Sequence, residues 1–429
     1  MRIIHTADLH LGQIIYQNYD RTDEHEHFFS QLERWCREEK PDALVVSGDI
    51  FDIQQPGAAT KKFFNDHFVS LARNNPGMAI VVIAGNHDSA SRIQADRSVW
   101  ALADAHLVGI APAADLSAAD AGWQDDYIVR LDSGYIVALP YMSSERKGVV
   151  QALLDAVESD NTDRKPVVLM GHAAIAGADM TGHGEIGLLR TQGLDSLGVG
   201  YDYLALGHIH KPQTLGHPDD AFTLTALTYP SGVARYSGSA LHVSCDEAYP
   251  HTVSVVDIPE RGADVTVRQL RIDELRHFYV LPEDGGSYST DEEALKGIRE
   301  FCRTHPGGYI RLRIDSKAVL ASNFNQSVYD ILAPYDEEIR YNPKTIWTGA
   351  DTAETAEASK PVFEVADLQQ MTDPMVFIEK TREQYPGLDM DMVRDAFKEV
   401  LAEVALLADE EKKNGRRGPK KASETVEAE

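Results

Sequence analysis

The sequence is poor in cysteine and has no long apolar run. Its 429 residues include three cysteines, Cys36, Cys245 and Cys302, which are odd in number and far apart. This excludes a disulfide framework and favours a reducing cytoplasm. No apolar run reaches the ~20 residues of a membrane helix, and the N-terminus leads directly into a polar segment unlike a signal peptide. We therefore expect a cytoplasmic protein without a membrane span.

Basic residues are also scarce. Lysine and arginine number 41 against 68 aspartates and glutamates, which gives a formal net charge of −27. The chain therefore lacks the broad basic footprint on which sequence-independent nucleic-acid binding depends. We expect the acidic excess to serve solubility. Attraction to a polyanion would then have to come from bound cations, local basic patches or a partner subunit.

Five short polar signatures follow one another along the chain. They are Asp8-Leu9-His10, Gly48-Asp49 in GDIFD, Gly85-Asn86-His87-Asp88, Gly171-His172 and Gly207-His208-Ile209-His210. Each follows an apolar run, at 3–4, 43–46, 79–83, 167–170 and 203–206. We expect these runs to be strands whose ends converge on one edge of a sheet. Mixed nitrogen and oxygen ligands suit Mn²⁺, Zn²⁺ or iron, and the ligands are too many for one ion. Two metals sharing Asp49 are therefore predicted.

The order D-x-H, GDxxD, GNHD, GH and GHxH resembles that of the calcineurin-like metallophosphoesterases. The start MRIIHTADLHLG and the segment RYSGS at 235–239 narrow the resemblance to the SbcD family, in the Mre branch of double-strand-break repair nucleases. The motifs that carry this resemblance lie within about residues 1–260.

The resemblance implies a site and a cofactor. One metal would take Asp8, His10, Asp49 and His210, and the other would take Asp49, Asn86, His172 and His208. The implied cofactor is a pair of divalent ions, with Mn²⁺ the best fit. His87 would protonate the leaving oxygen or stabilise the transition state, and Asp88 would orient the His87 ring. Asp52 stands where archaeal relatives carry a catalytic histidine.

The resemblance also implies a function. The chain would be a Mn²⁺-dependent DNA nuclease of repair and recombination, an exonuclease on double-stranded ends and an endonuclease on single strands or hairpins. It would work at the nucleoid with an SbcC-type coiled-coil ATPase, as a homodimer within a heterotetramer. The alternative is a metallophosphoesterase that acts on nucleotides or phosphoproteins. A non-catalytic scaffold is disfavoured because the ligand set is complete.

Residues 1–275 are predicted to form the nuclease domain, of α/β class. Helical spacing at 21–39 and 59–75 gives a βαβ first half, and the second half reads as more antiparallel. The resemblance implies two packed mixed sheets flanked by helices. His25 and His27 lie on an expected surface helix and are interpreted as solvated.

The remainder divides into four segments. Residues 276–347 are predicted to be a small α/β capping domain, with strands at 278–281 and 309–314 and helices at 290–304 and 323–333. Residues 348–370 are a small, polar and acidic linker. Residues 371–411 carry amphipathic helices, which either fold back on the body or dock on another protein; the resemblance favours the ATPase partner. Residues 412–429 are expected to be a disordered tail.

Overall fold

The computed structural model describes residues 1–348 apart from 17–18, 115, 117–121, 182–190, 217–222, 225–231, 244–246, 248 and 336. Residues 1–348 form one compact unit of the chain. The predicted linker beyond Thr348, the C-terminal helices and the tail lie outside the described residues. In the part of the chain that is described, no helix has the length and apolarity that a membrane crossing requires.

The first sheet has seven strands in the order β12-β15-β14-β1-β4-β5-β6. Their bounds are Thr223–Leu224 (β12), Thr266–Arg271 (β15), Thr252–Asp257 (β14), Arg2–Thr6 (β1), Ala43–Ser47 (β4), Ala79–Ile83 (β5) and Ala105–Val108 (β6). Strands β1, β4, β5 and β6 run parallel, whereas β14 pairs antiparallel with β1. The late strand β14 thus lies beside the first strand of the chain.

The second sheet has six strands in the order β11-β13-β10-β9-β8-β7. Their bounds are Gln213–Thr214 (β11), Val233–Tyr236 (β13), Tyr203–Gly207 (β10), Val167–His172 (β9), Gly134–Ala138 (β8) and Ile128–Leu131 (β7). Its four central strands are parallel, and only the two edge strands pair antiparallel. The predicted antiparallel pairing of the second half is thus confirmed for β7 with β8 and, in the first sheet, for β12, β14 and β15, whereas the four central strands of the second sheet are parallel. Their apolar runs are buried on both faces, as parallel strands usually are.

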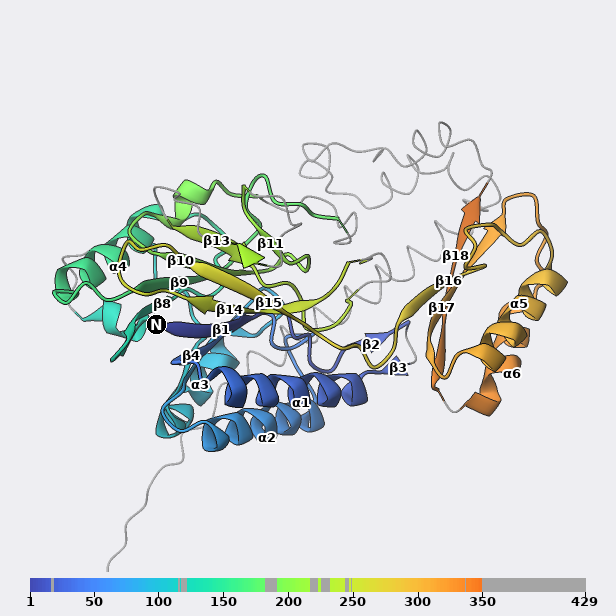
Figure 1. The fold of residues 1–429 in the computed structure, drawn as a ribbon, viewed down its shortest axis with the longest axis horizontal. Coiled ribbons are helices and arrows are strands. Elements are labelled where there is room, and N and C mark those ends of the chain that lie inside the picture. The colour runs from blue at the N-terminus through green and yellow to red at the C-terminus, as the bar shows by residue number, and fades with distance from the viewer. Residues whose placement is uncertain are drawn as a thin grey trace, which may run out of the picture. The chain divides into compact units, whose positions relative to one another are not determined.

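The helices cover the outer faces of the two sheets. Helices α1 (Thr22–Glu39), α2 (Ala58–Asn74) and α3 (Ala90–Trp100) pack on the first sheet, and α4 (Lys147–Asp160) packs on the second. A separate apolar core joins the inner faces of the sheets, with Val45 and Val81 on one side and Val168 and Ala205 on the other. Figure 1 shows α1 and α2 side by side below the strands. The predicted two packed mixed sheets flanked by helices are confirmed.

A third sheet lies in the region predicted to be the capping domain. Strands β16 (Phe278–Leu281), β17 (Gly308–Asp315) and β18 (Ile339–Thr348) are parallel neighbours, covered by α5 (Asp291–Thr304) and α6 (Phe324–Leu332). This region has an apolar core of its own. A small two-stranded sheet, β2 (Ile14–Ile15) with β3 (Tyr19–Asp20), and four short 3₁₀ turns (Ala101–Ala103, Trp123–Asp126, Leu194–Leu197 and Ala333–Tyr335) complete the described elements.

His25 on α1 is buried, so the prediction that it is solvated is wrong. Its Nε2 lies 2.8 Å from the carbonyl oxygen of Leu9, and its Nδ1 lies 3.0 Å from that of Arg21. His27 is half-buried and faces Asp273. The helix therefore uses His25 to support the loop that carries Asp8 and His10. A polar side chain can be buried in this way when neighbouring backbone oxygens accept its hydrogen bonds.

Candidate metal centre

All five signatures lie at the carboxyl ends of parallel strands. Asp8 and His10 follow β1, Asp49 follows β4, Asn86 to Asp88 follow β5, His172 ends β9, and His208 and His210 follow β10. Because the inner faces of the two sheets pack together, these strand ends meet at one edge of the sandwich. This is where open α/β folds place their ligands.

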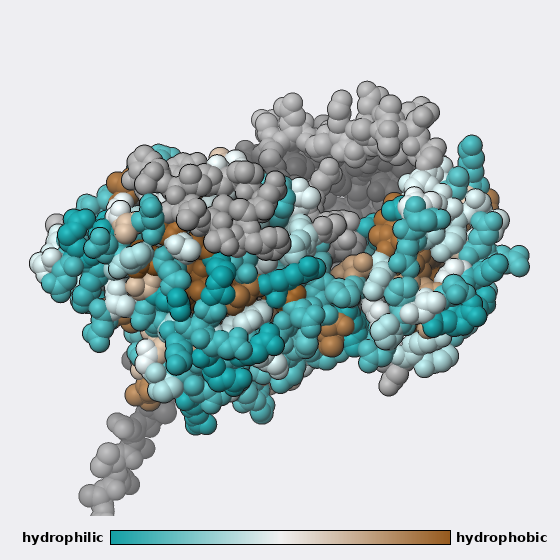
Figure 2. All heavy atoms as spheres, viewed as in Figure 1, coloured by the Kyte–Doolittle hydropathy of each residue, from teal (hydrophilic) through white to brown (hydrophobic). Residues whose placement is uncertain are grey.

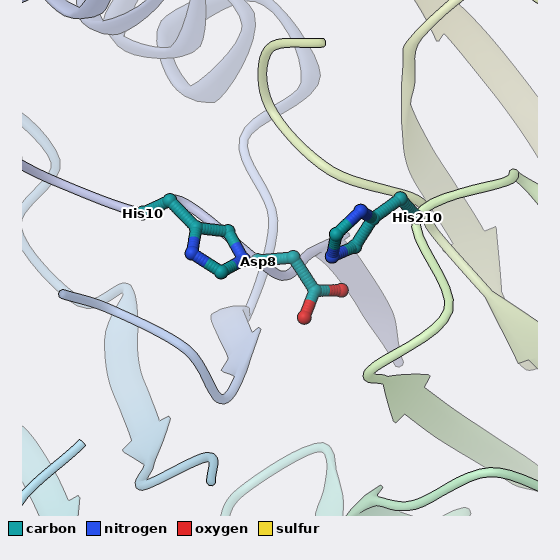
Figure 3. Close-up of side chains that lie close together, drawn as sticks. All are labelled: Asp8, His10 and His210. Carbon is teal, nitrogen blue, oxygen red and sulfur yellow. The ribbon is translucent and has the colours of Figure 1, made fainter. Parts of the chain in front are cut away.

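A first cluster joins Asp8, His10 and His210. Their ligand atoms lie within 4.8 Å of one another, and all three residues are buried. Figure 3 shows the carboxylate of Asp8 between the rings of His10 and His210. Both ring nitrogens of His10 are buried, and neither has a hydrogen-bond partner of good geometry. A neutral imidazole carries one N–H and one lone pair, so the lone pair of His10 needs a donor or a cation.

A second cluster joins Asp49, His172 and His208, whose ligand atoms also lie within 4.8 Å of one another. The amide oxygen of Asn86 lies 2.9 Å from His172 Nε2 and 2.8 Å from His208 Nδ1, so Asn86 belongs to the same cluster. On its far side, His172 Nδ1 donates to the carbonyl of Ser47 at 2.8 Å. Its Nε2 is thereby directed toward the cluster.

Asp49 lies between the two clusters. Its Oδ2 is 3.4 Å from His172 Nε2 in the second cluster and 3.9 Å from His10 Nε2 in the first. The seven residues predicted as ligands are therefore brought together, with Asp49 placed where a bridging carboxylate would be needed. The mixed nitrogen and oxygen donors of this set fit a pair of divalent ions.

The electrostatics of the set also fit bound cations. Burial raises the pKa of Asp8 to about 7. Burial acts to lower the pKa of His172, but the Asp49 and Asp8 carboxylates and the Ser47 carbonyl outweigh it and raise that pKa to about 9. Burial acts to raise the pKa of Asp49, but His172 and His10 outweigh it and lower that pKa. Divalent ions would satisfy the same negative charge while the imidazoles remain neutral ligands.

The backbone brings the ligands close at the cost of strain. Asp8, His10, Asp49 and His208 all have positive φ, which is rare outside glycine. Gly48 also has positive φ, and a Cβ there would lie 2.2 Å from His172 Nδ1. A Cβ on Gly207 would lie 1.9 Å from the carbonyl oxygen of Ser47. These two glycines are therefore required by the close approach of the ligand loops.

His87 is exposed at the rim of the clusters. Its ring lies edge to face against His10, with centroids 5.0 Å apart, and its Nδ1 donates to the carbonyl of Asp52 at 2.8 Å. Its backbone N–H donates to Asp49 Oδ1. The ring thus lies beside the proposed ligands, outside the two clusters described above.

Asp88 does not orient the His87 ring as predicted. Its carboxylate accepts three backbone N–H bonds, from Ile50, Phe51 and Gly85, at 2.8–3.0 Å. Asp88 therefore ties the loop after β4 to the loop after β5. The physical reason is local, because three unpaired N–H groups surround the carboxylate and the His87 ring points elsewhere.

Two further acidic residues lie near the ligands, and neither was predicted to be a ligand. Asp52 Oδ1 lies 3.3 Å from His10 Nδ1, and Asp52 forms a third cluster with His10 and His87. Glu247 Oε1 lies 2.9 Å from His210 Nδ1, although Glu247 is distant in the chain from all five motifs. Asp52 could have been proposed from its place in GDIFD, whereas nothing in the sequence around Glu247 distinguishes it from a surface acid.

Comparison with known proteins agrees with this geometry. Residues 1–212 match the calcineurin-like phosphoesterase family. The chain is 28% identical over 289 residues to the SbcD component of the SbcCD nuclease from Rhodobacter capsulatus, covering 60% of this chain and 66% of that protein. It is 27% identical over 363 residues to the SbcD component from Bacillus subtilis, covering 73% of this chain and 85% of that protein. It is also 23% identical over 266 residues to the DNA double-strand break repair protein Mre11 of Aeropyrum pernix, covering 61% of each.

The resemblance predicted from the five motifs is thus confirmed at modest identity. The family match spans every proposed ligand, since the last of them is His210. Residues 1–212 are thus similar to the calcineurin-like phosphoesterases, in a chain similar to the SbcD nucleases.

Proposed function

We propose that this chain is a metal-dependent nuclease that hydrolyses phosphodiester bonds in DNA, with Mn²⁺ as its metal and an SbcC-type ATPase as its partner. The observation that carries the proposal is the position of Asp49 between two clusters of buried and partly buried imidazole, carboxylate and amide ligands. The similarity to SbcD and Mre11 proteins supports DNA as the substrate.

Two divalent ions held by Asp8, His10, Asp49, Asn86, His172, His208 and His210 would supply positive charge for the phosphate oxygens and lower the pKa of a bound water. The protein contributes a ligand set of which only Asn86 and His208 are partly exposed. The amide of Asn86 adds a ligand without adding negative charge, which limits repulsion of an anionic substrate. Asp88 holds two of the ligand loops in register.

His87 is proposed as the acid for the leaving oxygen. Because its Nδ1 donates to the Asp52 carbonyl, Nε2 is the atom that can pass on a proton, from the imidazolium form of the ring. The ring is exposed, as a group that must reach the substrate should be. Its contact with Asp52 fixes one edge of the imidazole and so limits how the ring can turn.

A cavity of about 480 Å³ adjoins Asn86 and His208. It is also lined by Tyr141 and by hydroxyl and amide side chains, among them Ser143 and Gln192. Such a cavity gives a substrate access to the second cluster. Its lining holds the carboxylate of Glu145 and, among the described residues, no lysine or arginine, so it suits the sugar and base beside a phosphate better than a second phosphate.

The acidic composition is compatible with this function if the attraction for DNA is local. Hydrophilic residues dominate the face of the molecule shown in Figure 2. With a net charge of −27, this attraction would come from the metal ions, local basic patches or a partner subunit. We therefore propose that the activity belongs to a heterotetramer of two copies of this chain and two copies of an SbcC-type ATPase, at the nucleoid in the cytoplasm.

The test is to co-purify the chain with an SbcC-type ATPase and to measure digestion of linear duplex DNA with Mn²⁺. We expect cleavage that requires Mn²⁺ and is abolished by chelator and by Asp49→Ala. Bis-p-nitrophenyl phosphate serves as the comparison substrate. Hydrolysis of that ester or of nucleotides, without cleavage of DNA by the complex, would indicate a phosphoesterase of another branch. Full cleavage by metal-free protein would refute the two-metal site.

A further inference from the structure

We propose that Glu247 is a positioning residue for the metal ligand His210. The Glu247 side chain is 0% exposed, and its Oε1 accepts a hydrogen bond from His210 Nδ1 at 2.9 Å. A ligand imidazole can present only one nitrogen to a metal, and the hydrogen bond at the other nitrogen decides which one. Donation from Nδ1 to Glu247 leaves the Nε2 lone pair of His210 available for the ion. The inference rests on the ligand assignment of the proposed function.

Glu247 is itself held in place. Its second oxygen accepts the backbone N–H of Val243 at 3.0 Å and lies 3.5 Å from His251 Nε2. His251 is in turn fixed by a hydrogen bond from its Nδ1 to the carbonyl of Ser239 at 2.9 Å. A carboxylate fixed at both oxygens sets both the rotation and the tautomer of the imidazole that it contacts.

The two clusters differ in the acceptor that contacts the Nδ1–H of a ligand histidine. His172 in the second cluster donates its Nδ1–H to the neutral carbonyl of Ser47, whereas His210 in the first donates to a carboxylate. A carboxylate acceptor makes the imidazole a stronger ligand and adds negative charge behind it. We therefore expect the ion at Asp8, His10, Asp49 and His210 to bind more tightly than the other, and Glu247 to cause part of that difference.

Glu247→Gln is the most informative variant. Val243 N–H and His210 Nδ1–H both need an acceptor, and glutamine supplies a single oxygen for the two donors. We expect Mn²⁺ affinity at one of the two sites to fall about 10–100-fold, the usual effect of losing such a partner, while the other site keeps its affinity. Mn²⁺ titration followed by electron paramagnetic resonance of the free ion measures this without any reference to activity.

Glu274→Gln is the matched control. Glu274 is another poorly exposed acid that contacts histidines, His242 and His277, at 3.6 and 3.0 Å, but neither of these histidines is a proposed ligand. The Glu274→Gln substitution should leave the Mn²⁺ affinities of both sites unchanged. The double variant His210→Ala, Glu247→Gln should bind Mn²⁺ no more weakly than His210→Ala alone, because the effect of Glu247 passes through His210.

Unchanged Mn²⁺ affinity at both sites of Glu247→Gln, or equal weakening by Glu274→Gln, would overturn the inference. If Glu247→Gln fails to fold, the tautomer of His210 can be read by ¹⁵N NMR in the parent protein, with His210→Ala to assign the signal. We expect the Nδ1–H tautomer in Mn²⁺-free protein, and an Nε2–H tautomer would contradict the role. A parent chain that binds no Mn²⁺ would instead refute the proposed function itself.

Discussion

Gly171 and Gly207 each precede a ligand histidine, yet their surroundings differ. A Cβ on Gly207 would lie 1.9 Å from the carbonyl oxygen of Ser47, whereas one on Gly171 would approach nothing closer than Leu206 Cδ2 at 3.6 Å. Gly207→Ala should therefore displace His208 and cost about 1–3 kcal/mol of stability, with loss of Mn²⁺ binding. Gly171→Ala should fold and bind Mn²⁺ like the parent. Thermal unfolding and Mn²⁺ titration of both variants test this, and equal behaviour would show that the loops can relax.

His87→Ala should separate catalysis from metal binding. Its ring lies outside the two ligand clusters that meet at Asp49, so both Mn²⁺ ions should still bind. Losing a general acid typically lowers the rate about 10²–10⁴-fold. Single-turnover cleavage of DNA, together with Mn²⁺ stoichiometry, measures both effects. Cleavage at the parent rate would show that His87 takes no part in the chemistry. Loss of a Mn²⁺ ion would show that His87 is a metal ligand.

His25 should make stability depend on pH. Burial, with Arg21 nearby, lowers its pKa from 6.5 to about 4. Between these values the unfolded chain binds more protons, so the free energy of unfolding falls as pH decreases from 6.5 to 4 and levels off below that. The full effect is about 3 kcal/mol. Urea unfolding of His25→Gln and parent, in chelator, should show a smaller loss for the variant. Parallel curves would exclude His25 as a source of the acid sensitivity.

At the scale of elements, a buried ionic network joins the start of α1 to the third sheet. Arg340 on β18 donates to Glu24 at 3.0 Å and to the hydroxyl of Tyr309 at 2.8 Å, and the Tyr309 hydroxyl also donates to Glu24. Arg276 adds a contact to Asp23 at 2.6 Å. Glu24 is buried, and its partners are Arg21 beside α1, at 2.7 Å, together with Arg340 and Tyr309 from the region predicted to be the capping domain.

Arg340→Met should leave Glu24 short of a partner and destabilise the chain by about 3–5 kcal/mol. Hydrogen exchange should increase in α1 and β18 together. Arg303→Met is the control, because its pairing with Glu300 is exposed and such pairs contribute about 0–1 kcal/mol. A loss of stability no larger than that of the control would mean that Arg21 and Arg276 suffice to hold Glu24.

The ligand loops were predictable from the sequence because each polar signature follows an apolar strand. The positions of β14 and Glu247 were not. Strand β14 pairs with β1 across most of the chain, and local patterning carries no information on such pairing. The prediction for His25 is wrong because its ring nitrogens contact backbone carbonyls, which every residue has and which local patterning does not reveal. The sequence thus predicted the ligands and missed the residues that support them.

At the scale of the whole molecule, residues 1–348 form one unit that contains every proposed ligand. A chain that ends at Pro361 should therefore fold and bind Mn²⁺ like the full chain. It should lose the SbcC-type partner, because the predicted docking helices at 371–411 are removed. Pull-down with that ATPase, with Mn²⁺ binding as the control for folding, compares the two chains. Equal recovery of the partner would show that the helices do not dock it.

The pairing of β1 with β14 also affects how the chain folds during synthesis. The amino group of Met1 donates to the carbonyl of Ile258, 257 residues further along the chain. At ~5–20 residues per second, a ribosome needs roughly 12–50 s to supply that partner. Until then one edge of β1 is unpaired, and for most of this time β1, β4 and β5 also lack the complete second sheet, whose last strand ends at Tyr236. The nascent chain must be shielded over this interval, so we expect its yield in cells to depend on chaperones that act at the ribosome.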